Sequence, residues 1–390
     1  MIALTAARAY TPLECIDRPL ILLENEHIVE VSSQSARSIP PGAQIVDFGD
    51  AILGPGLVDI HIHGSAGHDV MSADAAGLET MERFLATHGV TSYCPTTVTA
   101  PIERTLSALD RLATHIENAG REDGGRARPI GIHLEGPFIS HVRRGVHPAA
   151  YLLAPSLDRF EQFWQAARGH IRVMTIAPEL DGAAEVIAEA ARRGVCVSLG
   201  HSDANLQTAR SAVAAGARHF THGFNAMRPL DHREPGIVGE MLTGTRASAD
   251  IIADGIHLDP AIVELFLKSK GPELAVLITD AIAAAGMPDG RYRLGTLEVE
   301  VKNGRCTANG RLAGSVLTMD RALRNAMRFG HWDLPQGLRA VSLNPARVTG
   351  QTDRGRLEAR CRADIAVLSP DGEVRTTIVG GAVAQATAKT

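Results

Sequence analysis

Between about residue 53 and residue 344, the chain alternates short apolar runs with longer segments in which apolar residues recur at helical spacing. The eight runs are nearly continuous in apolar residues, which is typical of parallel strands buried on both faces. They are LVDIHIHG (57–64), GVTSYCPT (89–96), PIGIHLEG (129–136), IRVMTIAPE (171–179), GVCVSLGHS (194–202), RHFTHGFNAM (218–227), ADIIADGIH (249–257) and LAVLITDA (274–281). The intervening segments, such as 73–89, 101–120 and 181–194, have helical periodicity and end at glycine.

Eight strand–helix units over about 290 residues match a (β/α)8 barrel in number and in length. The alternative is a doubly wound open sheet, which usually has fewer strands and a glycine-rich phosphate loop after the first of them. No G-x-G-x-x-G motif follows any of the eight runs. The pattern therefore predicts an α/β fold with a TIM-like (β/α)8 barrel over residues 54–344.

The two ends of the chain differ from this central part. Residues 1–53 and 345–390 contain short alternating strands and turn signals, and neither segment is long enough to bury a core of its own. We therefore expect both termini to combine into one small β-sandwich domain. A further hairpin-like insertion is expected over residues 290–314, between the eighth strand and the last helix.

Composition narrows the class of protein. The 390 residues carry a formal net charge of −5, with 45% hydrophobic and 21% charged residues, as expected for a globular enzyme that does not bind nucleic acid. No apolar run reaches the roughly 20 residues that span a bilayer, and the first residues do not resemble a signal peptide. The five cysteines are dispersed without a C-x-x-C pair, so we expect no disulfide framework and a cytoplasmic location.

Polar side chains gather where the apolar runs end. Six of the eight runs finish in histidine, aspartate or glutamate, and barrel enzymes place their sites at the carboxyl ends of the strands. These residues are His61, His63, His133, Glu135, His201, His219, His222, Asp254, His257 and Asp280. Any one of the histidines could equally be a hydrogen-bonded core residue, Asp280 could cap a helix, and Glu135 could pair with Arg143 or Arg144. Taken together, they predict a metal site.

Imidazole and carboxylate ligands without thiolate suit Zn, Fe, Co or Mn as divalent ions in a hydrolytic role, and the ligand types do not select among these metals. Such an ion acidifies water and polarises a carbonyl. A carboxylate on the last strand could then accept a proton from water and deliver it to a leaving amine, which departs poorly until it is protonated.

The motifs PGLVDIHIHG, HLEGPF, RRGVHP, LGHSDA, HGFNAM, HREPGIVG, ADGIH, ITDAI, LAGS and ADIAVL resemble those of the amidohydrolase superfamily. Within it, HLEGP and FNAM…HREPG resemble the N-acetylglucosamine-6-phosphate deacetylases, and the resemblance covers essentially the whole chain. Many superfamily members bridge two metals with a carbamylated lysine on the fourth strand. The four lysines here lie at 268, 270, 302 and 389, so Glu135 is the expected substitute.

The resemblance implies that Glu135, His201 and His222 hold the principal metal. It also implies that His61 and His63 belong to a second metal position bridged by Glu135, and that Asp280 is the catalytic acid and base. One or two divalent ions per subunit are therefore expected.

The resemblance further implies a substrate-binding set that contacts the sugar, its amide and its phosphate. His147 would contact the sugar and the amide, Asn225 and Ala226 the phosphate, and Arg233 would supply the phosphate-binding guanidinium. His257 and Leu312 complete the set. In the family, residues matching Arg233 and His257 bind substrate across a dimer interface, so a homodimer with a shared active site is expected.

The expected reaction is metal-dependent hydrolysis of N-acetyl-D-glucosamine 6-phosphate to D-glucosamine 6-phosphate and acetate. The nearest alternative is the same chemistry on a related substrate such as N-acetylgalactosamine 6-phosphate, because one loop side chain could read the distinguishing hydroxyl. An alternative from a different class of function is a non-catalytic barrel that has lost its metal and serves as an assembly partner. That alternative predicts that the ligand residues have been replaced. All six metal-site positions are intact in this sequence.

Overall fold

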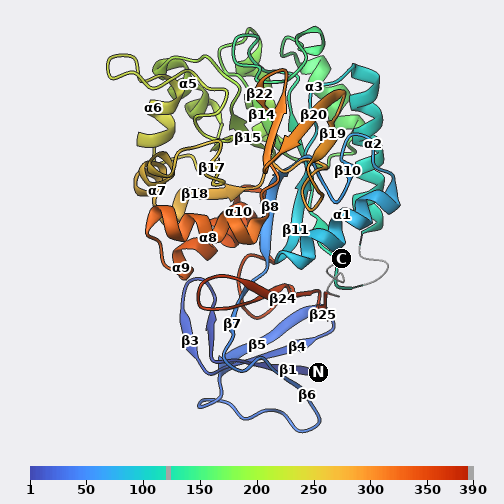
Figure 1. The fold of residues 1–390 in the computed structure, drawn as a ribbon, viewed down its shortest axis with the longest axis vertical. Helices are drawn as coiled ribbons and strands as arrows, with labels where there is room; N and C mark the ends of the chain where they lie inside the picture. Colours follow the sequence, from blue (N-terminus) through green and yellow to red (C-terminus); the bar gives the residue numbers. More distant parts are fainter. Residues whose placement is uncertain (120–123, 385–390) are drawn as a thin grey trace.

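The computed structural model of the protein describes residues 1–119 and 124–384 (Figure 1). All eight apolar runs contain a β-strand at the centre of the larger part of the molecule. In chain order these strands are β8 (Leu57–Ile62), β11 (Val90–Pro95), β13 (Ile132–Glu135), β14 (Ile171–Ile176), β15 (Cys196–Leu199), β16 (His219–Phe220), β17 (Ala249–Ile252) and β18 (Ala275–Ile278). A short strand, β12 (Arg128–Pro129), extends the pairing of β11.

The eight central strands follow one another in parallel. Ladders pair β8 with β11, β13 through β16 in sequence, and β17 with β18. A single bridge from Thr96 to His133 connects β11 with β13, and one from Ile62 to Ala281 brings the last strand beside the first. Backbone hydrogen bonds, such as the one from the Phe220 N–H to the Ser248 carbonyl, connect β16 with the start of β17. The arrangement is the TIM-barrel type of α/β fold that the sequence predicts.

Helices surround this sheet and bury their apolar faces against it (Figure 1). They are α1 (Ala75–Thr87), α2 (Ile102–Asn118), α3 (Leu157–Ala166), α4 (Ala183–Arg192), α5 (Leu206–Ala215), α6 (Gly236–Thr243), α7 (Pro260–Leu274), α8 (Met319–Gly330), α9 (Leu334–Leu338) and α10 (Asn344–Val348). The helix starts follow capping chemistry: the side chain of Asp74 accepts the N–H of Gly77 before α1, and Asn205 does the same for Thr208 before α5.

Strands from both chain ends lie together below the barrel in Figure 1. One sheet has the order β25-β24-β23-β7-β2-β3 and a second has the order β5-β4-β1-β6. In the first sheet, β7 (Ile52–Pro55) from the N-terminal part pairs antiparallel with β23 (Ile365–Leu368) from the C-terminal part. The other strands are β1 (Ile2–Thr5), β2 (Arg8–Tyr10), β3 (Cys15–Asp17), β4 (Pro19–Glu24), β5 (His27–Ser33), β6 (Gln44–Asp47), β24 (Val374–Val379) and β25 (Ala382–Val383). Strands from both ends of the chain thus share one sheet; residues 385–390 lie outside the described part.

The expected insertion forms an antiparallel four-stranded sheet. Its strands are β19 (Gly290–Leu294), β20 (Leu297–Lys302), β21 (Arg305–Ala308) and β22 (Arg311–Leu312). This sheet has a small apolar core of its own, in which Leu294, Val299 and Cys306 pack with Val98 and Ile282 from the barrel loops. The insertion therefore lies against the carboxyl ends of the barrel strands, where the candidate site is found.

Candidate metal centre and active site

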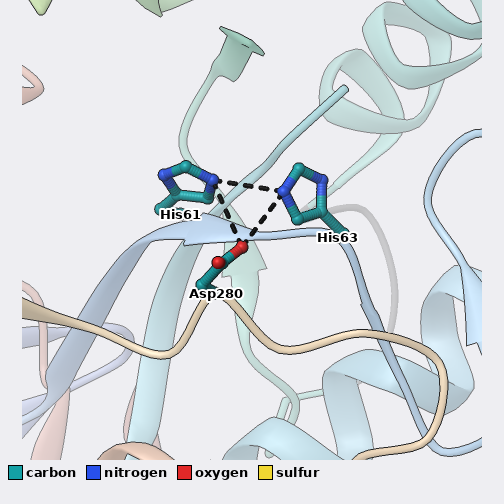
Figure 2. A group of neighbouring side chains, drawn as sticks. All are labelled: His61, His63 and Asp280. Atoms are coloured by element: carbon teal, nitrogen blue, oxygen red, sulfur yellow. Dashed lines mark hydrogen bonds and ion pairs between the residues drawn. The ribbon is translucent and has the colours of Figure 1, made fainter. Parts of the chain in front are cut away.

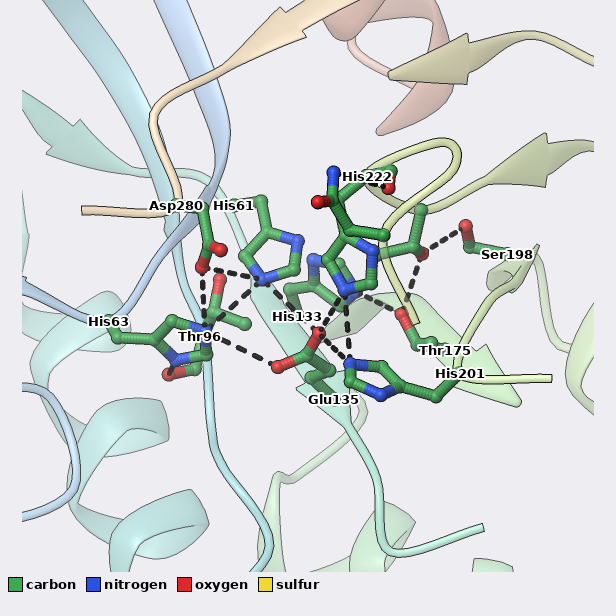
Figure 3. Close-up of polar contacts among 12 residues, drawn as sticks. His61, His63, Thr96, His133, Glu135, Thr175, Ser198, His201, His222 and Asp280 are labelled. Carbon is green, nitrogen blue, oxygen red and sulfur yellow. Dashed lines mark hydrogen bonds and ion pairs between the residues drawn. The ribbon is translucent and has the colours of Figure 1, made fainter. Parts of the chain in front are cut away.

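The predicted ligands converge because each ends or follows a parallel strand at the same end of the barrel (Figure 3). Glu135 is the last residue of β13, and His63, His201, His222 and Asp280 follow β8, β15, β16 and β18 within two residues. His61 lies within β8. All six side chains are buried.

Glu135, His201 and His222 form the first group. Glu135 Oε1 lies 3.1 Å from His222 Nε2 and 3.3 Å from His201 Nε2, and the two Nε2 atoms are 3.0 Å apart. His61, His63 and Asp280 form the second group, shown in Figure 2, with the two Nε2 atoms 3.2 Å apart. Asp280 Oδ1 lies 3.5 Å from His61 Nε2 and 3.2 Å from His63 Nε2.

Glu135 stands between the two groups. Its Oε1 is 3.5 Å from His61 Nε2 and its Oε2 is 3.3 Å from His63 Nε2. A carboxylate in this position has one oxygen available to each side, which is the arrangement required of a bridging ligand.

The hydrogen bonds behind two of the imidazoles prepare them to bind a metal. His201 Nδ1 lies 2.9 Å from the carbonyl oxygen of Arg143, and His63 Nδ1 lies 3.2 Å from that of Thr96. A carbonyl only accepts, so Nδ1 donates and the neutral ring keeps its lone pair on Nε2, which faces the cluster. Converging lone pairs repel one another unless a cation lies between them. These residues therefore fit a metal.

The charges of the site lead to the same conclusion. Burial opposes the charge of Glu135, but the neighbouring imidazoles, His61 foremost, hold its pKa well below the ordinary value. Burial also opposes the charge of Asp280, but His63 and His61 lower its pKa to about 2. Burial lowers the pKa of His201 to about 4, whereas the carboxylates of Asp280 and Glu135 overcome burial at His63 and raise its pKa to about 10. Two buried carboxylates this close need a cationic partner. A proton on His63 Nε2 can serve in the metal-free site, and a divalent ion bound there would displace that proton and leave the neutral ring described above.

Two candidate histidines support the ligands and lie outside both groups. His133 Nδ1 faces the carbonyl of Ile60 at 3.0 Å, and its Nε2 lies 2.8 Å from Thr175 Oγ1. His219 Nε2 lies 2.8 Å from Asp250 Oδ2, and the other oxygen of Asp250 accepts the backbone N–H of His222. Asp250 thereby fixes the turn that carries a ligand.

A cavity of about 210 Å³ opens onto the metal centre. It is lined by the expected ligands His63, Glu135, His201, His222 and Asp280, and also by the expected substrate-binding residues His147, Asn225, Ala226, His257 and Leu312. Asp254, a further candidate, lies 2.8 Å from His257 Nδ1 and orients that ring. Arg233 is the exception, because it lies exposed in the loop before α6 and does not line the cavity of its own chain.

Sequence reasoning missed the groups that orient the ligands. The second apolar run ends without histidine or carboxylate, yet the loop after β11 supplies the Thr96 carbonyl to His63 and the Thr99 hydroxyl to His147, 2.8 Å from its Nδ1. The residue types in the sequence likewise give no sign that the Arg143 carbonyl orients His201.

Among the described residues, no helix is long and apolar enough to cross a membrane.

Comparison with known proteins identifies the family of this chain. The sequence profile of the amidohydrolase family matches residues 52–384. The chain is 40% identical to N-acetylglucosamine-6-phosphate deacetylase of Bos taurus, over 86% of this chain and 84% of that one. It is 37% identical to N-acetylgalactosamine-6-phosphate deacetylase of Escherichia coli O157:H7, over 92% and 95%.

Among solved structures, the fold matches a mutant N-acetyl-D-glucosamine-6-phosphate deacetylase from Mycobacterium smegmatis in complex with N-acetyl-D-glucosamine-6-phosphate. The TM-score is 0.91 at 34% identity, and the match covers 98% of each chain. The chain therefore belongs to the amidohydrolase family and, within it, to the N-acetylglucosamine-6-phosphate deacetylases.

Proposed function

We propose that this protein hydrolyses N-acetyl-D-glucosamine 6-phosphate to D-glucosamine 6-phosphate and acetate, in amino-sugar catabolism or cell-wall recycling. The observation that carries the proposal is the cavity in which Glu135, His201, His222 and Asp280 face the expected sugar-binding side chains. Relatives of that activity at 35–40% identity support the substrate.

Glu135, His201 and His222 would hold the principal divalent ion, and His61 and His63 a second one, with Glu135 between them. Zn, Fe, Co and Mn all suit this donor set. A bound divalent ion would polarise the acetyl carbonyl and make water more acidic. We propose that each subunit binds one or two of these ions.

Asp280 is the group that moves the proton. Its low pKa keeps the carboxylate ionised near neutral pH, so it can accept a proton from the attacking water. The water oxygen forms a new C–O bond with the acetyl carbon, and the C–N bond then breaks. As it breaks, the same proton passes to the departing amine nitrogen, and acetate is released. Oδ1 lies 3.2 Å from His63 Nε2, and Asp280 lines the cavity, so the carboxylate stands beside the expected ligands.

The remaining cavity residues would bind the phosphosugar. Asn225, Ala226 and His257 line one part of the cavity and Leu312 enters from the insertion sheet. Arg233 would reach the phosphate from a second subunit, which accounts for its position outside the cavity of its own chain. Exposed Val142 and Leu230 on loops at the same end of the barrel support a homodimer with a shared site.

Two broader proposals accompany the activity. Residues 54–344 would form the catalytic (β/α)8 barrel, and 1–53 with 345–390 a small β-sandwich domain. A separate apolar cluster that joins Leu4, Ile21, Ile365 and Val367 supports this division. The dispersed free cysteines support a cytoplasmic protein, and the net charge of −5 supports one that does not bind nucleic acid.

The test is deacetylation of the phosphosugar by the purified protein, together with its metal content. The Asp280→Asn variant is expected to lose orders of magnitude in kcat while it retains metal, because an amide cannot accept the proton. Near-wild-type turnover would exclude Asp280 from this role. Comparing kcat/KM on the N-acetylglucosamine and N-acetylgalactosamine phosphates decides between the proposed substrate and the alternative.

A further inference from the structure

The imidazole of His147 is held differently from those of the metal ligands. His147 Nδ1 lies 2.8 Å from Thr99 Oγ1 and receives the backbone N–H of Thr99 at 3.4 Å. Both residues are buried, and the Thr99 hydroxyl has no other hydrogen-bond partner among residues 1–119 and 124–384.

A backbone N–H only donates, so its contact indicates that His147 Nδ1 accepts. A bond as long as 3.4 Å is weak, and the 2.8 Å contact with the Thr99 hydroxyl therefore supplies most of the restraint on this tautomer. A neutral imidazole has one ring proton, and in His147 this proton therefore lies on Nε2. In His63 and His201 the Nδ1 atom faces a carbonyl, and the proton lies at the opposite position. The loop that follows β11 thus fixes opposite tautomers, through the Thr96 carbonyl for His63 and through Thr99 for His147.

The tautomer separates a ligand from a hydrogen-bond donor within one cluster. Donor atoms of Glu135, His147 and His201 lie close enough together to share a metal ion. His147, however, presents an N–H on Nε2, which lies 3.5 Å from Glu135 Oε2 on the wall of the cavity. An N–H cannot coordinate a metal, but it can donate to an oxygen of the substrate.

The backbone next to the ligand Glu135 makes room for this contact. Gly136 has φ +72°, and a Cβ atom there would lie 2.3 Å from Thr99 Oγ1. Glycine at this position therefore lets the Thr99 hydroxyl approach His147.

We propose that Thr99 is a positioning residue that fixes His147 as the Nε2–H tautomer, so that His147 donates a hydrogen bond to an oxygen of the bound substrate. The kinetic consequence rests on the proposed function, whereas the tautomer itself does not.

The test compares Thr99→Val with two controls. Thr97→Val is the matched control, because its buried hydroxyl in the same loop has no hydrogen-bond partner in the described chain. Thr99→Ser keeps the hydroxyl. We expect Thr99→Val to lower kcat/KM by about tenfold, the size of one lost hydrogen bond, and both controls to stay within about twofold. The effect of Thr99→Val should also disappear in a His147→Gln background, whose amide keeps an N–H near the Nε2 position.

Nitrogen-15 NMR of histidine-labelled, zinc-loaded protein reports the tautomer directly, with the His147 signals assigned from the His147→Gln variant. Wild type should have the proton on Nε2, and Thr99→Val should gain the Nδ1–H form. A wild-type Nδ1–H signal would overturn the proposal, as would a Thr99→Val variant that behaves like Thr97→Val. If wild type does not deacetylate the sugar phosphate, the proposed function fails while the NMR result still decides the tautomer.

Discussion

Replacing Asp250 is the most direct test of how the barrel positions His222, one of the expected metal ligands. Asp250 is the second residue of β17, and its side chain is fully buried. It accepts hydrogen bonds from two groups, the backbone N–H of His222 and Nε2 of His219. His222 has φ +33°, a left-handed conformation that a residue with a side chain adopts only when its surroundings enforce it. The hydrogen bond from the His222 N–H to Asp250 Oδ1 restrains this conformation.

Asp250→Asn keeps the shape of the side chain but replaces one acceptor oxygen with a donor NH2. If the NH2 group faces the N–H of His222, two donors meet. If it faces His219, that ring must move its proton from Nε2 to Nδ1, beside the Ser248 hydroxyl, and in both cases the charge assistance of the carboxylate is lost. We therefore expect a loss of about 1–3 kcal/mol in the free energy of unfolding. Because His222 would also lose its restraint, metal affinity should fall by about 10- to 100-fold.

Urea unfolding of the metal-free protein, followed by circular dichroism, measures the first effect, and titration against a competing chelator measures the second. Asp181→Asn is the control, since Asp181 is exposed and makes no hydrogen bond or ion pair in the described chain. If Asp250→Asn matches the control within about 0.5 kcal/mol and binds metal like wild type, the reasoning about the ligand turn is wrong.

Three further changes probe other parts of the chain. Arg233→Ala should raise KM strongly for the phosphorylated sugar, and an equal loss on the unphosphorylated sugar would refute a phosphate contact. Asp203→Asn removes the 2.7 Å ion pair between Asp203 and Arg143, the residue whose carbonyl orients His201. The variant should bind metal about threefold more weakly in a chelator titration, and unchanged affinity would refute this link. Burial lowers the pKa of Lys270 to about 8 from 10.5, so between these values the unfolded chain binds more protons and wild type gains stability as pH rises. Lys270→Met should lack that gain in urea unfolding at pH 8 and pH 10, and an identical rise in both proteins would contradict the assignment.

The positions of the expected ligands could be predicted because each stands where an apolar run ends, and parallel strands present their carboxyl ends at one face. Depth along a strand could not be predicted in the same way. His133 and Glu135 share a face of β13, but residues two apart differ by about 6.6 Å along the strand, so His133 lies one layer deeper and bonds to Thr175. Nothing in the residue types of this pair distinguishes the supporting residue from the ligand.

The orienting groups were beyond sequence reasoning for a different reason. Two of them, the carbonyls of Thr96 and Arg143, are backbone atoms that every residue possesses, and their role depends on the path of a loop. Thr99 is one of three threonines in the stretch Thr96–Thr99, and only the folded loop distinguishes its hydroxyl from that of Thr97.

The insertion sheet divides the site into two parts that can change separately. The ligands stand on barrel strands or directly after them, whereas Leu312 belongs to a sheet with its own small core, tied to the barrel loops by contacts such as the Gly295 N–H to Asp69 Oδ2 at 2.8 Å. Mutations in β19–β22 can therefore reshape this wall of the cavity without moving an expected metal ligand. For an engineer who wants a deacetylase for a different amino sugar, this sheet is the part to diversify while the barrel remains constant.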